Sequence, residues 1–260
     1  MVAMQRLFCL CAGTISIEDR MQTTETSVKV GKDTIAIVKT GEGRILTLNG
    51  TIFSMVKDGT PYTGLYWDLF VPLPSLFESA SVLVIGLGGG TIPRQLKDVY
   101  GDRIVVDVVE ISREMVGLSE RFAPGLSSRV NIIVGDGLDY VSREASKYDI
   151  IILDAYGPNL RIPRGFLAKE FVASTLAALK PDGLFAVNYV FTLRQFLAFP
   201  GYLRTLRRGF HSVYMISDGP FLLSNLVMVC SKSISSAELR RRIRERFPST
   251  SETERILGRF

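Results

Sequence analysis

A glycine-rich segment and three carboxylates stand at the ends of successive apolar runs in the middle of the chain. Glycines let a backbone turn tightly and come close to a ligand, and the N–H groups of a helix that begins there point at that ligand. Glu110 follows Gly90 by 20 residues, at the end of the next apolar run. A carboxylate in that place can accept both hydroxyl hydrogens of a ribose. We therefore predict that a nucleoside cofactor contacts Gly86, Gly88, Gly90 and Glu110.

The second carboxylate separates two kinds of nucleoside cofactor. Asp136 and Gly137 follow the third apolar run. A carboxylate there, or its neighbouring amide, suits the exocyclic amine of adenine, which favours an adenosyl sulfonium over a nicotinamide or flavin dinucleotide. Asp136 is also a good N-cap for a helix that starts near Leu138, and both roles can hold at once.

The third carboxylate, Asp154, ends the fourth run and is followed by Ala155-Tyr156-Gly157. A carboxylate at the carboxyl end of a central parallel strand points into the ligand crevice of such a sheet. The structural alternative is an N-cap in the loop after the strand. The four successive strand ends are glycine-rich, acidic, acidic and acidic. This combination points to a ligand site more specifically than any one of its members, so we predict a catalytic role for Asp154.

Apolar runs and helix-length segments alternate through the region that carries these residues. This alternation predicts a parallel α/β sheet with right-handed crossovers, and continuous apolar runs are typical of strands buried on both faces. Residues 180–183 are predicted to form a tight turn between a helix and a strand. Apolar residues over 222–229 suggest a final strand pair. The runs are 82–85, 105–109, 130–134, 150–153 and 184–187, and the helical segments are 91–100, 113–122 and 169–179.

The first 60 residues have a different pattern, with short alternating runs separated by glycine turns. They predict an antiparallel sheet of three to five strands. A helix is predicted from about Pro61 to Phe77. The chain is thus divided into an N-terminal β-strand domain (1–60), a connecting helix (61–80) and a Rossmann-like nucleoside-binding catalytic domain (81–260).

Composition excludes several classes of protein. The 260 residues are 47% hydrophobic and 22% charged, as in globular domains, and carry 31 Lys and Arg against 26 Asp and Glu. With one His and three Cys, we expect neither a metal site nor a disulfide framework, and a cytoplasmic location. No apolar run approaches the roughly 18 residues needed to span a membrane. Leu239, Ile243 and Phe247 favour a packed C-terminal helix over nucleic-acid binding by its arginines.

Several motifs resemble those of one enzyme family, the spermidine synthases and related polyamine aminopropyltransferases, over about residues 25 to 230. Thr47-Leu48-Asn49-Gly50 is similar to the family's Leu-Asp-Gly turn, and Tyr66-Trp67-Asp68 stands in the place of its Tyr-His-Glu. Residues 82–90 are similar to its Val-Leu-Val-Ile-Gly-Gly-Gly-Asp-Gly, and Val109-Glu110-Ile111 to its Val-Glu-Ile-Asp. Gly135-Asp136-Gly137 resembles its Gly-Asp-Ala or Gly-Asp-Gly, and Asp154-Ala155-Tyr156-Gly157-Pro158 stands in the place of its Asp-Ser-Ser-Asp-Pro.

The resemblance implies a class I methyltransferase fold, a mostly parallel doubly wound sheet with a small N-terminal antiparallel β domain. It implies a transferase that moves the aminopropyl group of decarboxylated S-adenosylmethionine to a diamine or polyamine, without a metal. Asp154 would bind the ammonium and accept its proton, and Tyr66, Asp68 and Tyr156 would line the amine pocket. Family members of this kind are homodimers or homotetramers.

Three residues depart from the family pattern: Gly89 replaces an Asp of the glycine loop, Gly157 a second carboxylate, and Trp67 a His. The sequence is thus more similar to the divergent branch called spermidine synthase-like. Two alternatives stay open: an S-adenosylmethionine-dependent methyltransferase of unknown substrate, and a catalytically inactive relative.

Overall fold

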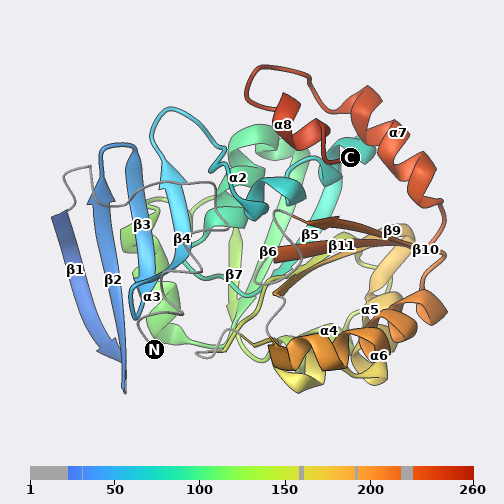
Figure 1. Cartoon of the computed structure of the whole chain (residues 1–260), viewed down its shortest axis with the longest axis horizontal. Coiled ribbons are helices and arrows are strands. Elements are labelled where there is room, and N and C mark those ends of the chain that lie inside the picture. The colour runs from blue at the N-terminus through green and yellow to red at the C-terminus, as the bar shows by residue number, and fades with distance from the viewer. Residues whose placement is uncertain (1–22, 31, 158–160, 191–192, 218–224) are drawn as a thin grey trace.

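A computed structural model describes residues 23–30, 32–157, 161–190, 193–217 and 225–260. Residues 1–22 of the predicted N-terminal domain, and Pro158 and Leu222, lie outside these ranges. The described residues form two sheets and the helices around them (Figure 1).

The smaller sheet lies at one end of the molecule and has four antiparallel strands, as predicted (Figure 1). Its order follows the sequence: β1 (Thr23–Val30), β2 (Asp33–Thr40), β3 (Gly43–Leu48) and β4 (Thr51–Lys57). β4 is therefore an edge strand, and its open edge is the one that faces the larger sheet.

The larger sheet has seven strands in the order β10-β11-β9-β8-β5-β6-β7. Neighbours from β9 to β7 run parallel, whereas β10 and β11 are antiparallel. The order reverses between β8 and β5, and ligands bind outside the carboxyl ends of the strands at such a switch point. The bounds are β5 (Ala80–Ile85), β6 (Ile104–Glu110), β7 (Asn131–Val134), β8 (Tyr148–Leu153), β9 (Leu179–Val190), β10 (Ser212–Ser217) and β11 (Asn225–Ser231).

Helices cover both faces of this sheet, so its central strands are buried on both sides. Val82 and Val84 of β5 belong to one core cluster and Leu83 and Ile85 to the other, because side chains alternate along a strand. The helices of the first cluster are α2 (Thr91–Tyr100), α3 (Arg113–Phe122), α7 (Ser236–Arg246) and α8 (Glu254–Leu257). Those of the second are α4 (Gly137–Arg143), α5 (Lys169–Ala178) and α6 (Leu193–Gly209).

Two local predictions are wrong. The connecting helix over 61–77 is replaced by two short 3-10 helices, at Tyr66–Phe70 and Leu73–Leu76. Pro72 and Pro74 lack the N–H groups that an α-helix needs there. The tight turn at 180–183 is instead an irregularity inside β9, where Tyr148 pairs with Leu179 and Ile150 with Leu184. The division of the chain at residues 60 and 80 stays a prediction.

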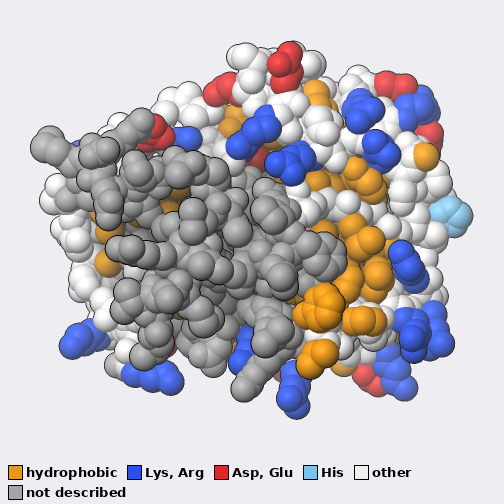
Figure 2. All heavy atoms as spheres, viewed as in Figure 1, with side chains coloured by type: hydrophobic (Ala, Val, Ile, Leu, Met, Phe, Trp, Pro, Cys, Tyr) orange, Lys and Arg blue, Asp and Glu red, His pale blue; other side chains and the backbone are white. Residues whose placement is uncertain are grey.

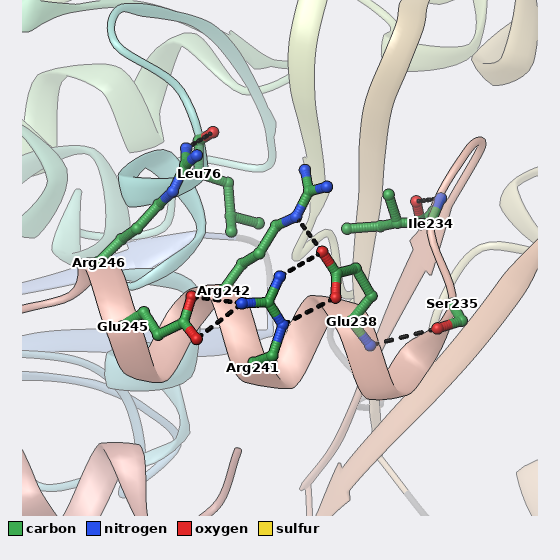
Figure 3. A network of polar contacts seen from close by, with 9 residues as sticks. Leu76, Ile234, Ser235, Glu238, Arg241, Arg242, Glu245 and Arg246 are labelled. Carbon is green, nitrogen blue, oxygen red and sulfur yellow. Dashed lines mark hydrogen bonds and ion pairs between the residues drawn. The ribbon is translucent and has the colours of Figure 1, made fainter.

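The C-terminal helix α7 is packed as predicted, and it is capped by Ser235. The Ser235 hydroxyl accepts a hydrogen bond from the Glu238 N–H, and Leu239 and Ile243 are fully buried. Figure 3 shows its outer face, where Arg241 and Arg242 bind Glu238, and Arg241 also binds Glu245. These arginines are therefore engaged in ion pairs on their own helix.

Figure 2 shows part of one face of the molecule. In the visible part of the face in Figure 2, Lys and Arg side chains lie at several separate places, some of them beside exposed hydrophobic side chains. Exposed hydrophobic residues include Leu197 of α6 and Met215 of β10. No helix in the described ranges is long and apolar enough to cross a membrane.

Backbone groups at the open edge of β4 find hydrogen-bond partners at the start of α2. The Thr91 hydroxyl accepts a hydrogen bond from the Met55 N–H (3.1 Å) and donates one to the Met55 carbonyl (3.0 Å). The Ser54 hydroxyl accepts from the Gly89 N–H at 2.7 Å. Since Thr91 is 2% exposed, these contacts are sheltered from water, and they attach the small sheet to the glycine loop.

We predict that Thr91→Val lowers the free energy of unfolding by about 1–3 kcal/mol, because the buried N–H and carbonyl of Met55 lose their partner. Thr91→Ser keeps the hydroxyl and serves as the matched control, and we expect its free energy of unfolding to be closer to that of the parent protein. Urea unfolding of the three proteins measures the difference. Equal stability of the Val and Ser variants would contradict the role given to the hydroxyl.

Candidate active site

The glycine loop between β5 and α2 is shaped by the strand beside it. Gly86 has a φ of 94°, and a Cβ there would lie 2.5 Å from the carbonyl oxygen of Asp154. Only glycine allows that approach. Gly90 is the N-cap of α2 in the left-handed conformation, with a φ of 88°. The predicted cofactor loop thus lies directly against the end of β8.

Glu110 joins this loop to the next helix. One carboxylate oxygen accepts a hydrogen bond from the Leu87 N–H at 2.9 Å, and the other accepts from the Ser112 N–H at 2.9 Å. Ser112 is the N-cap of α3. Each carboxylate oxygen has a second lone pair, so these bonds leave acceptors for hydroxyl groups. The ribose role of Glu110 stays a prediction.

Asp136 serves as the N-cap of α4, with its side chain accepting from the Leu138 N–H at 2.8 Å. The side chain is exposed, so it can also meet a ligand. Gly137 is buried at the first position of the helix, where a Cβ would lie 2.6 Å from the Ile85 side chain. The helix-capping alternative for Asp136 is confirmed, and its contact with adenine stays a prediction.

The Asp154 carboxylate accepts hydrogen bonds from two elements, the 3-10 helix Tyr66–Phe70 and strand β9. The Tyr66 hydroxyl lies 3.1 Å and 3.3 Å from its two carboxylate oxygens, and the Asn188 amide N–H donates to one of them at 2.9 Å. Desolvation raises the pKa of Asp154 to about 6, although hydrogen bonds from Asn188, Tyr66 and Trp67 lower it. The group is thus a carboxylate at neutral pH that holds a proton more readily than an exposed Asp.

Tyr156 lies in the loop after β8 and reaches the next strand. Its hydroxyl donates to the backbone carbonyl of Asn188 at 2.5 Å. Burial raises the pKa of Tyr156 well above 10. Tyr66, Asp154 and Tyr156 therefore come together as predicted neighbours, while their roles toward a ligand stay predictions.

Asp68 is held elsewhere. It is 2% exposed, and its oxygens accept hydrogen bonds from the N–H groups of Thr63 and Gly64, the Thr63 hydroxyl and the Gln95 amide. These bonds organise the loop before the first 3-10 helix. Among the described residues, Asp68 makes no hydrogen bond or ion pair with a group that also contacts Asp154, so its place in an amine pocket stays a prediction. The neighbouring Trp67 is buried against the Tyr66 ring, at 4.7 Å between ring centroids.

Sequence reasoning missed Asn188 as a partner of Asp154. It is 1% exposed and follows the apolar run that became the core of β9. The signal for Asn188 is a polar residue directly after an apolar run, at the same ends of the strands as the carboxylates.

Gly89 leaves no space for a side chain. A Cβ there would lie 2.6 Å from the Phe122 ring and 2.8 Å from the Ser54 Cβ. The carboxylate that the family resemblance places here is therefore absent from the sequence and also excluded by the packing around it. Within the described residues, no group of three or more His, Cys, Asp or Glu side chains could hold a metal ion.

Sequence comparisons identify a matching family model and several related proteins. The model of the spermine/spermidine synthase domain matches residues 69–214. The polyamine aminopropyltransferase of Thermoanaerobacter sp. (strain X514) is 30% identical over 184 residues, which cover 64% of this chain and 64% of that protein. Putrescine N-methyltransferase 2 of Nicotiana attenuata is 34% identical over 149 residues, or 55% of this chain and 39% of that protein. The chain therefore spans less than two thirds of the length of these relatives.

Solved structures share the fold. A probable spermidine synthase from Corynebacterium glutamicum has a TM-score of 0.71 at 20% identity, covering 90% of this chain and 94% of that one. Human methyltransferase-like protein 13, in complex with SAH, has a TM-score of 0.56 at 24% identity, covering 74% of this chain and 88% of that one. They confirm the predicted class I methyltransferase fold.

We predict that Gly89→Asp destabilises the protein by about 1–3 kcal/mol, because the new side chain collides with Phe122 and Ser54. Gly135→Asp is the matched control, since it lies after β7 with no atom within 4 Å of its Cβ position. Thermal unfolding of both variants measures the difference. If Gly89→Asp is as stable as Gly135→Asp, the space assigned to Phe122 is wrong.

Proposed function

Because the chain belongs to the spermine/spermidine synthase family, we propose that it transfers the aminopropyl group of decarboxylated S-adenosylmethionine to a diamine or polyamine. The observation that carries the proposal is Asp154, a carboxylate with a raised pKa at the end of β8, beside the glycine loop. A polyamine aminopropyltransferase that is 30% identical over 64% of this chain supports it.

The reaction needs a group that frees the amine. An alkylamine has a pKa of roughly 10 and arrives protonated, without a lone pair for attack. Ionised Asp154 binds the ammonium and accepts a proton from it. Burial raises the pKa of Asp154 from 3.8 to about 6, which narrows the gap to the amine and eases the proton transfer.

The freed amine nitrogen then attacks the methylene beside the sulfonium of the donor. A C–N bond forms as the C–S bond breaks, and the electron pair of that bond goes to sulfur. Methylthioadenosine leaves as a neutral thioether, so no acid is needed at the leaving group. The charges balance in this scheme: the ammonium gives a proton to the carboxylate, and the positive charge of the sulfonium passes to the nitrogen that forms the new C–N bond.

The donor occupies the carboxyl ends of β5, β6 and β7 in our proposal. The backbone of Gly86, Gly88 and Gly90 approaches the nucleoside, and Glu110 accepts from the ribose hydroxyls. Asp136 and Gly137 lie at the adenine. On the other side of Asp154, the rings of Tyr66 and Tyr156 border the methylenes of the amine.

Asp68 fits this scheme less well than the other predicted residues. Its Oδ1 accepts three hydrogen bonds, and its Oδ2 accepts one from the Gly64 N–H and lies 3.8 Å from the Arg255 guanidinium. Since Asp68 is also 2% exposed, a diamine would have to compete with these partners for a buried carboxylate. We therefore assign amine recognition to Tyr66 and Tyr156. A cytoplasmic homodimer or homotetramer remains part of the proposal, and light scattering measures the assembly.

One observation favours a second candidate, methyl transfer from S-adenosylmethionine. The packing of Phe122 and Ser54 at Gly89 excludes the carboxylate that the family resemblance places beside the aminopropyl ammonium. A putrescine N-methyltransferase is also among the relatives, at 34% identity. Displacement at a methyl carbon uses the same base, so Asp154 serves either reaction.

The products distinguish the two reactions. The protein is incubated with di- and triamines and with either decarboxylated S-adenosylmethionine or S-adenosylmethionine, and products are identified by mass spectrometry. We expect methylthioadenosine and a lengthened polyamine from the first donor. S-adenosylhomocysteine and a methylated amine establish the second candidate, and no product from either donor identifies an inactive relative.

We predict that Asp154→Asn lowers kcat by at least about 100-fold at pH 8, because the amide accepts no proton. The kcat/KM of the parent protein should rise with pH through about 6, since burial raises the pKa of Asp154 to that value. Steady-state kinetics between pH 5 and 9 measure both. Turnover by the Asn variant near the parent rate removes Asp154 from the base role.

The same substitution has an opposite effect on stability. The folded-state pKa of Asp154 is raised by burial from 3.8 to about 6, so ionisation of this group weakens the fold as pH rises through that interval. We expect the free energy of unfolding of Asp154→Asn to exceed that of the parent protein by on the order of 1–3 kcal/mol. This difference should be absent below about pH 4 and complete above about pH 6. Urea unfolding at pH 4 and pH 8 measures it. A pH-independent difference contradicts the assigned shift.

A further inference from the structure

Asn188 is a polar side chain in one of the most apolar parts of the molecule. It lies in β9 between β8 and β11, and its neighbours Val187 and Tyr189 are fully buried. Asn188 itself is 1% exposed. Burial of an amide is unfavourable unless its polar atoms are bonded, so the contacts of this side chain are informative.

Only half of the amide is bonded. Its N–H donates to the Asp154 carboxylate at 2.9 Å. Its oxygen is buried and has no hydrogen-bond partner among the described residues. An ionised carboxylate only accepts hydrogen bonds, so the N–H must face Asp154 and the oxygen must face away from this bond. The amide is thus oriented by one partner, at the cost of an unpaired oxygen.

The backbone of the same residue holds the other side of the loop. The Asn188 carbonyl accepts from the Tyr156 hydroxyl, two residues after Asp154. The register of β9 is set by pairs with both neighbouring strands, including Leu153 with Val187 and Asn188 with Val227. A strand built into the centre of the sheet therefore places the contacts to Asp154 and Tyr156.

We propose that Asn188 is a positioning residue, which holds the Asp154 carboxylate in place for the amine through its amide N–H. The inference rests on the proposed function. If this position had only a structural role, a leucine of similar volume would stabilise the fold more than asparagine does, because leucine has no buried oxygen that lacks a partner. The bond to Asp154 is what the asparagine adds.

The electrostatic surroundings of Asp154 make this bond measurable. The side chains that hydrogen-bond to it are Tyr66, Trp67 and Asn188. The nearby Tyr156 is neutral in this pH range, because burial and the charge of Asp154 raise its pKa. No charged side chain of the described residues shifts the pKa of Asp154, which is set by burial and by these hydrogen bonds. Loss of a donor to the ionised form therefore raises the pKa.

The test compares Asn188→Leu, Asn188→Gln and the parent protein by two readouts. Carbon-13 NMR of labelled aspartate follows the titration of Asp154 without any substrate, and the Asp154→Asn variant assigns its signal. We expect the pKa of Asp154 to rise by about one unit in Asn188→Leu, and by less in Asn188→Gln, which keeps an amide. Thr175→Val is the control for loss of a buried hydrogen-bonding side chain away from the site, and should leave the titration unchanged.

The second readout is activity with the donor that the product analysis identifies. We expect Asn188→Leu to lower kcat about tenfold at pH 7 and to move the acidic limb of the rate profile upward, with thermal stability at pH 5 equal to or above the parent value. An unchanged Asp154 titration in Asn188→Leu overturns the proposal. Absence of product from the parent protein overturns the proposed function alone, because the NMR titration is independent of turnover.

Discussion

The close approach of the glycine loop to the end of β8 is the contact on which the site depends. The Asp154 N–H donates to the Ile85 carbonyl, and the Gly86 N–H donates to the Val109 carbonyl, so three strand ends are joined backbone to backbone. Gly86 allows this because it carries no Cβ toward Asp154. The catalytic carboxylate and the nucleoside loop of our proposal thus lie on the same rigid set of strand ends. This keeps the distance between the donor carbon and the base constant.

The small N-terminal sheet contributes to the same edge. The backbone of Met55 in β4 hydrogen-bonds to the Thr91 side chain, and the Ser54 side chain accepts from the Gly89 N–H. The open edge of this strand is therefore covered by the glycine loop and the start of α2. The loop is held from one side by β4 and from the other by β8. Gly89, in the middle of the loop, is packed between Ser54 of β4 and Phe122 of α3, although it lies near the ligand site of our proposal.

Local sequence signals predicted the parts of the fold that local physics decides. Helices α2 and α3 begin and end where the sequence placed them, since Gly90, Ser112 and the apolar spacing act within a few residues. The helix predicted over 61–77 does not form, because two prolines disfavour an α-helix more than the apolar spacing favours one. The site was harder, because its partners are distant in sequence. Tyr66 and Asn188 reach Asp154 across 88 and 34 residues, and no pattern of spacing encodes those contacts.

The filling of the space at Gly89 has a consequence for the ways in which this sequence can change. Phe122 and Ser54 come from different elements, and each is placed by its own packing. A carboxylate at residue 89 becomes tolerable only after the aromatic ring has been replaced, and replacing the ring first leaves a void in the core. Each step is unfavourable without the other. The two positions are therefore coupled, and a change to an acidic loop passes through less stable intermediates.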